Sequence, residues 1–143
     1  MRKLIALGSI LLMTIATACT AHSVIANDKT GFLCAVEGEK LLNPAMSDQA
    51  VCAMFKTKVD DALARQTVSI DSPSKAGSAG WVQIRLRFSK PGSASARIVQ
   101  NAEGKVTNYP ELGVDVMDRT MGPKDVERLA MEVAKLFTAL KKD

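Results

Sequence analysis

Histidine is almost absent from this sequence, since the 143 residues include only one, His22. His22 lies in an N-terminal segment that we expect to be removed or to serve as a tether, so the rest of the chain offers no imidazole. This excludes Ser/His and Cys/His nucleophilic mechanisms and any metal site that needs a histidine ligand. We therefore predict no catalytic residue and no metal.

Phosphate-binding loops are lacking as well. Two stretches rich in small residues, 77–80 and 91–95, contain glycine, but neither has the lysine and the following helix of a nucleotide-binding loop. Both are better explained as connectors next to strands. The sequence therefore predicts no cofactor.

The first 26 residues have the layout of a bacterial export signal. Arg2 and Lys3 precede an uncharged apolar run, residues 4–16, and small residues follow. A membrane-spanning helix needs roughly 20 residues, so an uncleaved anchor is the weaker interpretation. Residues 24–26, Val-Ile-Ala, suit a signal peptidase that selects small side chains, and we expect Asn27 to be the first mature residue.

A second kind of processing competes with this cleavage. Residues 15–19, Ile-Ala-Thr-Ala-Cys, resemble a bacterial lipoprotein signal, in which the thiol of a new N-terminal Cys19 carries the lipid. Ala16 stands where leucine is usual. Acyl chains on Cys19 would tether the domain to a membrane. We expect membrane association only if Cys19 is lipidated or the signal is uncleaved.

Either form of processing leaves Cys34 and Cys52 as an even pair. In an oxidising periplasm such a pair forms a disulfide. Closing this loop should stabilise the fold by about 3 kcal/mol. A reactive thiol is the competing interpretation, but the chain has neither a C-x-x-C motif nor a mature histidine to lower a thiol pKa.

Residues 27–143 suffice for one small domain. Removing residues 1–26 leaves 117 residues, enough for a single modest core. The net charge falls from +4 to +2, because Arg2 and Lys3 leave and no acidic residue does. This near-neutral balance argues against a nucleic-acid partner, which usually selects a strongly basic domain.

Periodic apolar residues predict two helices. Ser47 is a favourable N-cap, and an apolar stripe at every fourth position continues to Leu63. A second helix begins at Pro123, where the missing N–H of proline costs least. Its apolar stripe predicts packing against the core. This stripe comprises Val126, Leu129, Ala130, Val133, Leu136, Phe137 and Leu140.

Alternating residues predict the strands. Residues 81–88 alternate strictly, and residues 94–98 continue the buried face on an antiparallel neighbour. A three-residue loop at 103–105 then leads into a third long strand, which runs to about Met117 and either lies at a sheet edge or bends at Pro110. This loop predicts a register in which Ala102 lies opposite Val106. An open edge could accept a partner's strand, but Pro110 itself guards against that.

The predicted fold is α+β. Residues 67–71 add a short strand, and residues 31–36 form a possible one. The element order is then a possible strand, a helix, four strands and a helix. We expect a two-layer sandwich, an antiparallel sheet of about four strands with two helices packed on one face.

A candidate ligand surface lies on the outward face of this sheet. The registers place Arg85 opposite Arg97, Arg97 opposite Glu111, and Val99 opposite Tyr109. Like charges in direct opposition destabilise a sheet slightly, which is consistent with a site for an anionic or sugar-like ligand. The competing interpretation is a solvated face whose arginines are compensated by Glu111 and Asp115. The candidate ligand-binding residues are Trp81, Arg85, Arg87, Arg97 and Tyr109.

The functional hypothesis is an exported cell-envelope protein, a non-catalytic periplasmic binding or accessory module. Its partner is an unknown envelope protein or an anionic or sugar-like ligand. The alternative is an outer-membrane lipoprotein, lipidated at Cys19, that acts as an envelope assembly factor. A third hypothesis is a small carboxylate-dependent hydrolase that uses Glu111 and Asp115.

Overall fold

The computed structural model describes residues 29–139. The expected signal segment, with Cys19 and His22, lies outside the described residues. The described chain contains two α-helices, two short 3-10 helices and six strands. In chain order they are β1 (Gly31–Glu37), η1 (Glu39–Leu41), α1 (Asp48–Leu63), β2 (Val68–Ser69), η2 (Pro73–Lys75), β3 (Trp81–Lys90), β4 (Ser93–Ala102), β5 (Lys105–Asn108), β6 (Leu112–Asp115) and α2 (Pro123–Ala139).

The α+β prediction is confirmed, but the sheet is mixed and has more strands than expected. The strands are ordered β2-β1-β3-β4-β5, and β6 also pairs with β4. β1 runs parallel to both β2 and β3. The prediction of a purely antiparallel sheet was therefore wrong. The physical reason is that α1 connects β1 to β2 and carries the chain back along the sheet. The segment with η2 then leads from β2 to β3, so both strands start at the same end as β1.

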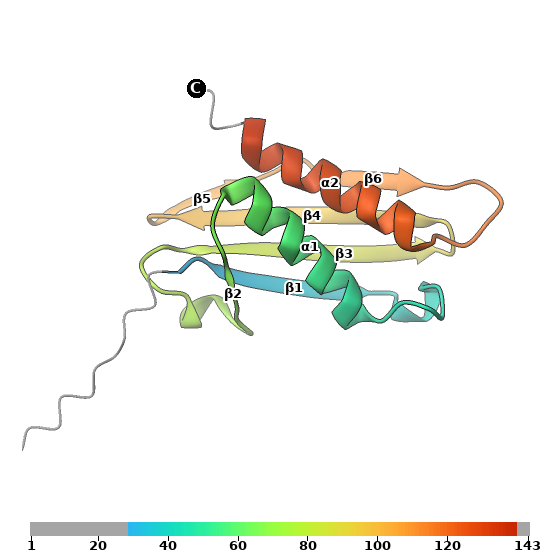
Figure 1. Cartoon of the computed structure of the whole chain (residues 1–143), viewed down its shortest axis with the longest axis horizontal. Helices are drawn as coiled ribbons and strands as arrows, with labels where there is room; N and C mark the ends of the chain where they lie inside the picture. The colour runs from blue at the N-terminus through green and yellow to red at the C-terminus, as the bar shows by residue number, and fades with distance from the viewer. Residues whose placement is uncertain (1–28, 140–143) are drawn as a thin grey trace, which may run out of the picture.

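The two helices cover one face of the sheet, and Figure 1 shows α1 and α2 crossing that same face. Val51, Phe55 and Val59 of α1 are fully buried, at the four-residue spacing read from the sequence. Alternate residues of β3 and β4 meet them from the sheet. The core comprises Phe32, Val51, Phe55, Val59, Val82, Ile84, Leu86, Phe88, Ala94, Ala96, Ile98, Tyr109, Met121, Val126, Leu129, Ala130, Val133 and Phe137.

The disulfide prediction is confirmed. Cys34 of β1 bonds to Cys52 of α1, with 5.8 Å between their Cα atoms. Ser47 caps α1 as expected, and its hydroxyl oxygen accepts a hydrogen bond from the Ala50 N–H at 3.1 Å. The disulfide therefore fastens the first helix to the first strand.

The strand after β4 differs from the expected one. Ala102 pairs with Lys105 across a two-residue turn, where Glu103 and Gly104 both have positive φ values, 52° and 81°. The chain leaves the ladder near Pro110 and rejoins it as β6. Leu112 then lies opposite Ala96, in the expected register. The register of β5 is one residue away from the predicted one, and such a slip turns side chains to the opposite face.

The start of α2 is held by a salt bridge. The two terminal guanidinium nitrogens of Arg119 donate to the Asp125 carboxylate, at 2.6 and 2.8 Å, and the Gly122 N–H donates to the same carboxylate at 2.9 Å. The Arg119 hydrogen bonds first, and then the Gly122 N–H, lower the pKa of Asp125 from 3.8 to about 2. The Asp125 side chain is 9% exposed. This carboxylate therefore fixes the loop before α2 to the helix.

Asp125→Asn should lower the free energy of unfolding at neutral pH by about 1–2 kcal/mol, because the charge-assisted bonds to Arg119 are lost. The folded pKa lies below the unfolded value of 3.8, so this contribution is present above pH 3.8 and disappears as the pH falls to about 2. Urea unfolding of both proteins from pH 7 to 2 measures the difference. A difference that stays constant down to pH 2 would contradict this assignment. Asp71→Asn, at an exposed Lys75 ion pair, is the matched control and should change little.

Candidate functional site

The uncovered face of the sheet gathers three arginines. Arg85 of β3 lies directly opposite Arg97 of β4, as the alternation predicted, and Arg87 lies opposite Ser95. All three arginine side chains are exposed. On the other side of β3, the parallel strand β1 places Glu37 beside Arg87. The three arginines therefore come from two neighbouring strands, and Glu37 lies next to them on the β1 side.

These side chains surround a small hollow of about 120 Å³. Its volume suits one compact polar group rather than a large ligand. The walls come from β1, β3, β4 and the segment before β6. We call this the arginine hollow, and it is lined by Glu37, Arg85, Leu86, Arg87, Ser95, Arg97 and Glu111.

The charges around the arginine hollow are only partly compensated. One Arg97 guanidinium nitrogen lies 3.5 Å from a Glu111 carboxylate oxygen, and both side chains are at least half exposed. Ser95 first, and then Arg97 and Arg87, lower the pKa of Glu111 below its usual value. Within residues 29–139, Arg85 and Arg87 form no salt bridge. The hollow therefore holds two guanidinium groups, those of Arg85 and Arg87, whose N–H donors are free to bind an anion.

Tyr109 does not belong to this face, and its predicted place there was wrong. Its side chain is 9% exposed, and its ring centroid lies 5.1 Å from that of Phe137 in α2. The Tyr109 hydroxyl donates to the side-chain carbonyl of Gln100 at 2.6 Å, and burial raises the pKa of Tyr109. The reason is the one-residue slip at the Glu103–Gly104 turn. The Tyr109 N–H bonds to the carbonyl of Ile98, which places Tyr109 at an inward position.

Trp81 lies on the outward face, but outside the arginine hollow. It pairs with Asn101 and Gly31 at the start of β3. Four residues of extended chain separate it from Arg85, a distance of roughly 13 Å. The face therefore brings together Arg85, Arg87 and Arg97, and does not bring either predicted aromatic platform to them.

Glu37 and Ser95 were not among the site residues predicted from sequence. The position of Ser95 could have been predicted, because Ser95 alternates with the inward residues Ala94 and Ala96 and therefore faces outward beside Arg87. The position of Glu37 could not, since only the parallel pairing of β1 with β3 brings it to the hollow. The anionic wall of the site therefore depends on the part of the topology that local patterns do not encode.

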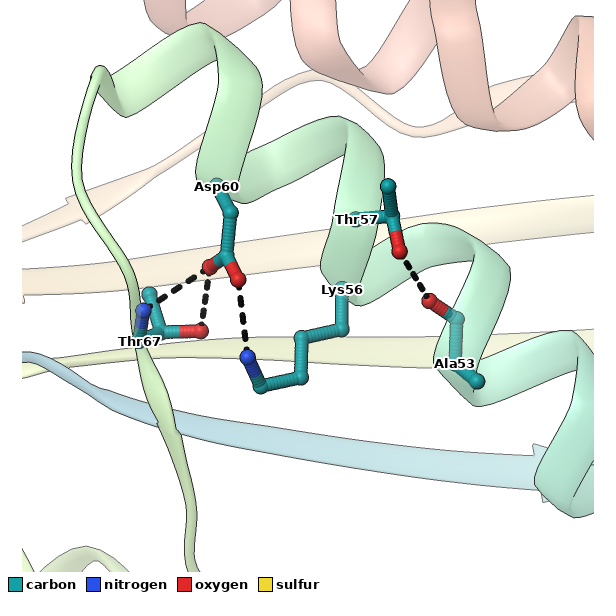
Figure 2. A network of polar contacts seen from close by, with 5 residues as sticks. All are labelled: Ala53, Lys56, Thr57, Asp60 and Thr67. Carbon is teal, nitrogen blue, oxygen red and sulfur yellow. Dashed lines mark hydrogen bonds and ion pairs between the residues drawn. The ribbon is translucent and has the colours of Figure 1, made fainter.

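A second polar cluster, shown in Figure 2, has a structural role. Asp60 of α1 accepts hydrogen bonds from the Thr67 N–H and hydroxyl, at 2.9 and 2.6 Å, and from the Lys56 ammonium group at 2.8 Å. Burial raises the pKa of Asp60, but these bonds outweigh it, and the net pKa is lowered. Asp60 thus fastens the chain leaving α1 to the start of β2, and its carboxylate is already satisfied.

Metal binding and carboxylate chemistry can each be compared with the positions of the described residues. Residues 29–139 contain no cluster of three or more His, Cys, Asp or Glu side chains that could hold a metal ion. Glu111 and Asp115 are four residues apart in a mostly extended segment, roughly 13 Å. Glycosidases of the two common classes place their carboxyl groups about 5 to 9.5 Å apart. This spacing does not favour the hydrolase hypothesis.

No helix among residues 29–139 has the length and apolar character required to cross a membrane.

Comparisons with known proteins give a likeness in structure alone. No protein-family model matches the sequence, and no curated protein matches it. A solved structure described as "Crystal structure of uncharacterized protein" is similar to this chain with a TM-score of 0.46 and 14% sequence identity. The match covers 79% of this chain and 90% of that chain.

Proposed function

We propose that this protein is an exported, non-catalytic binding module of the bacterial cell envelope, and that its arginine hollow binds an anionic group of an envelope component. The observation that carries the proposal is the pair Arg85 and Arg97. These two residues lie directly opposite each other on β3 and β4, and Arg85 forms no salt bridge within residues 29–139.

The opposed arginine pair has an energetic cost in the absence of a ligand. Like charges directly opposite each other destabilise an antiparallel pair, and the Arg97–Glu111 contact is too long and exposed to offset much of it. A bound carboxylate or phosphate group would accept hydrogen bonds from both guanidinium groups. The arrangement would then contribute to ligand affinity. The small volume of the hollow limits recognition to one such group of a larger molecule.

Export is supported by the sequence of the first 26 residues and is compatible with the disulfide. A disulfide between Cys34 and Cys52 persists in an oxidising compartment such as the periplasm. The lipoprotein alternative keeps the same domain and the same hollow, and differs in the processing at Cys19.

Arg85→Ala combined with Arg97→Ala should reduce capture of the envelope component by about tenfold or more, because two charge-assisted contacts are lost. The measurement is a pull-down from the native envelope with the wild-type and variant proteins. Removal of a like-charge pair at exposed positions should leave the thermal unfolding midpoint unchanged or slightly raised.

The matched control removes two positive charges outside the hollow. Lys90→Ala combined with Lys105→Ala alters exposed residues of β3 and β5. This variant should capture the component as the wild type does. Equal capture by the wild type and the Arg85/Arg97 variant would rule the hollow out as the binding site.

A further inference from the structure

β1 is an edge strand over most of its length. β3 pairs with every residue of β1, from Gly31 to Glu37. β2 pairs on the other side with Gly31 and Phe32 only. Within the described residues, no further strand pairs with this side of β1. The stretch Leu33–Glu37 therefore has an open edge, which we call the β1 edge.

The hydrogen bonds around β1 show which groups point outward. The carbonyls of Thr30 and Phe32 accept from the N–H groups of Val68 and Ile70, each at 2.9 Å. The Gly31 N–H donates the opposite way, to the Gly80 carbonyl. Because alternate residues of a strand bond to opposite sides, Cys34 and Val36 direct their N–H and C=O groups to the open side.

The β1 edge lacks the usual guards against strand pairing. Natural edges carry lysines, prolines or bulges. The sequence of Leu33–Glu37 is LCAVE, with no proline and with its one charge at the end. The opposite side of the sheet is better protected, because Pro110 interrupts it between β5 and β6.

An apolar hollow of about 320 Å³ lies beside this edge, below α1. Its apolar walls come from β1, α1 and the end of β2, and they include both sulfur-bearing residues of the disulfide. A strand that extended the sheet here would bring its inward side chains to the mouth of this hollow. The lining residues are Phe32, Cys34, Gln49, Cys52, Ala53, Lys56, Ser69 and Ile70.

We propose that the β1 edge pairs with the same stretch of a second copy of this chain, antiparallel, about a two-fold axis at Ala35. An antiparallel partner must direct its own backbone N–H and C=O groups toward those of both Cys34 and Val36. In this register Cys34 lies opposite Val36 of the second copy, and each such pair exchanges two backbone hydrogen bonds. The interface is isologous and closed, as in most dimers.

The bounds of the edge select this register. A two-fold axis at Cys34 would require Phe32, whose outward groups β2 already occupies. An axis at Val36 would require Gly38, whose φ of 79° takes it out of the extended conformation. The axis at Ala35 uses Leu33–Glu37 of both copies and nothing beyond it.

The side chains also suit this self-pairing. Ala35 meets Ala35 of the second copy in a non-hydrogen-bonded pair, where Cα atoms approach to about 4.5 Å and small side chains fit best. Glu37 lies opposite Leu33, whose side chain is already buried in its own copy at 6% exposed, rather than opposite another carboxylate. Val36 of the second copy lies next to Cys34, at the mouth of the apolar hollow. The edge therefore avoids like-charge contacts with itself and places an aliphatic side chain where apolar surface is open.

Sedimentation velocity of the full chain, as the cell processes it and with its disulfide intact, tests this inference. We expect a reversible dimer at about 100 µM, in keeping with a small interface. Ala35→Lys and Ala35→Glu each place like charges directly across the axis and should weaken dimerisation by about tenfold or more. An equal mixture of the two variants should restore the dimer, because opposite charges then meet.

Val106→Lys is the matched control, since it adds the same charge to an exposed residue of β5 on the other side of the sheet. It should dimerise as the wild type does. Circular dichroism checks that each variant is folded. A monomeric wild type, an Ala35→Lys variant that dimerises normally, or a mixture that remains monomeric would each overturn the proposal.

Discussion

Replacing both Cys34 and Cys52 with alanine should lower the free energy of unfolding by about 3 kcal/mol. The disulfide joins β1 to α1 across a sequence separation of 18 residues, and without it the unfolded chain gains conformational freedom. Urea unfolding followed by far-UV circular dichroism gives the value.

The control for this prediction is reduction of the wild-type protein. Reduced wild type and the double alanine variant should unfold at the same urea concentration, and a reductant should not shift the variant. Both measurements together separate the loss of the cross-link from the loss of two sulfur atoms. A wild type that unfolds at the same urea concentration with and without reductant would show that this bond does not stabilise the fold.

Gly80→Ala should lower the free energy of unfolding by about 3 kcal/mol or more, because the substitution combines a strained backbone with a backbone clash. Gly80 has φ of +80°, and a Cβ atom there would lie 1.9 Å from the Asn101 carbonyl oxygen. The Gly80 carbonyl also accepts the Gly31 N–H. A methyl group would therefore separate the ends of β1, β3 and β4 where they meet, directly before Trp81.

Gly104→Ala is the matched control for this substitution. Gly104 has nearly the same φ, +81°, but no atom lies within 4 Å of the position that its Cβ would take. The Gly104→Ala substitution should lower the free energy of unfolding by only about 1 kcal/mol, the cost of placing alanine in the left-handed conformation. Thermal or urea unfolding compares the two. Equal losses would show that β3 and β4 can move apart at Gly80 without cost.

The parts of the fold that local patterns encode could be predicted from sequence. Strict alternation in β3 and β4 fixed their register, since a slip would have turned Ile84 and Arg85 to the wrong faces. Four-residue spacing and the Ser47 cap located α1. Two cysteines left after processing could pair only with each other. Arg85, Arg87 and Arg97 followed from the same alternation.

The remaining features depend on contacts that local patterns do not specify. The parallel pairing of β1 joins residues about 50 positions apart, and nothing within residues 31–37 distinguishes a parallel from an antiparallel neighbour. A three-residue loop fitted the inward pattern as well as the two-residue turn at Glu103 and Gly104 that the structure has. The difference of one residue places Tyr109 in the core instead of on the candidate face.

The arginine hollow and the β1 edge lie on the same sheet, but the proposals made for them are independent of each other. Ala35 and Glu37 of the edge pair with Arg85 and Arg87 of β3. A dimer through β1 would therefore bring two arginine hollows onto one continuous outer face. Each claim has its own measurement, capture of an envelope component for the hollow and oligomeric state for the edge.

The intact mass and thiol content of the protein recovered from its native cells test whether it is an exported and disulfide-linked module. We expect a chain that begins at Asn27, found in the periplasmic fraction, with Cys34 and Cys52 both resistant to alkylation until a reductant is added. A chain beginning at an acylated Cys19 would replace the free module with the lipoprotein. The full-length chain in the cytosol, with both thiols open to alkylation, would rule out both export and a stable disulfide.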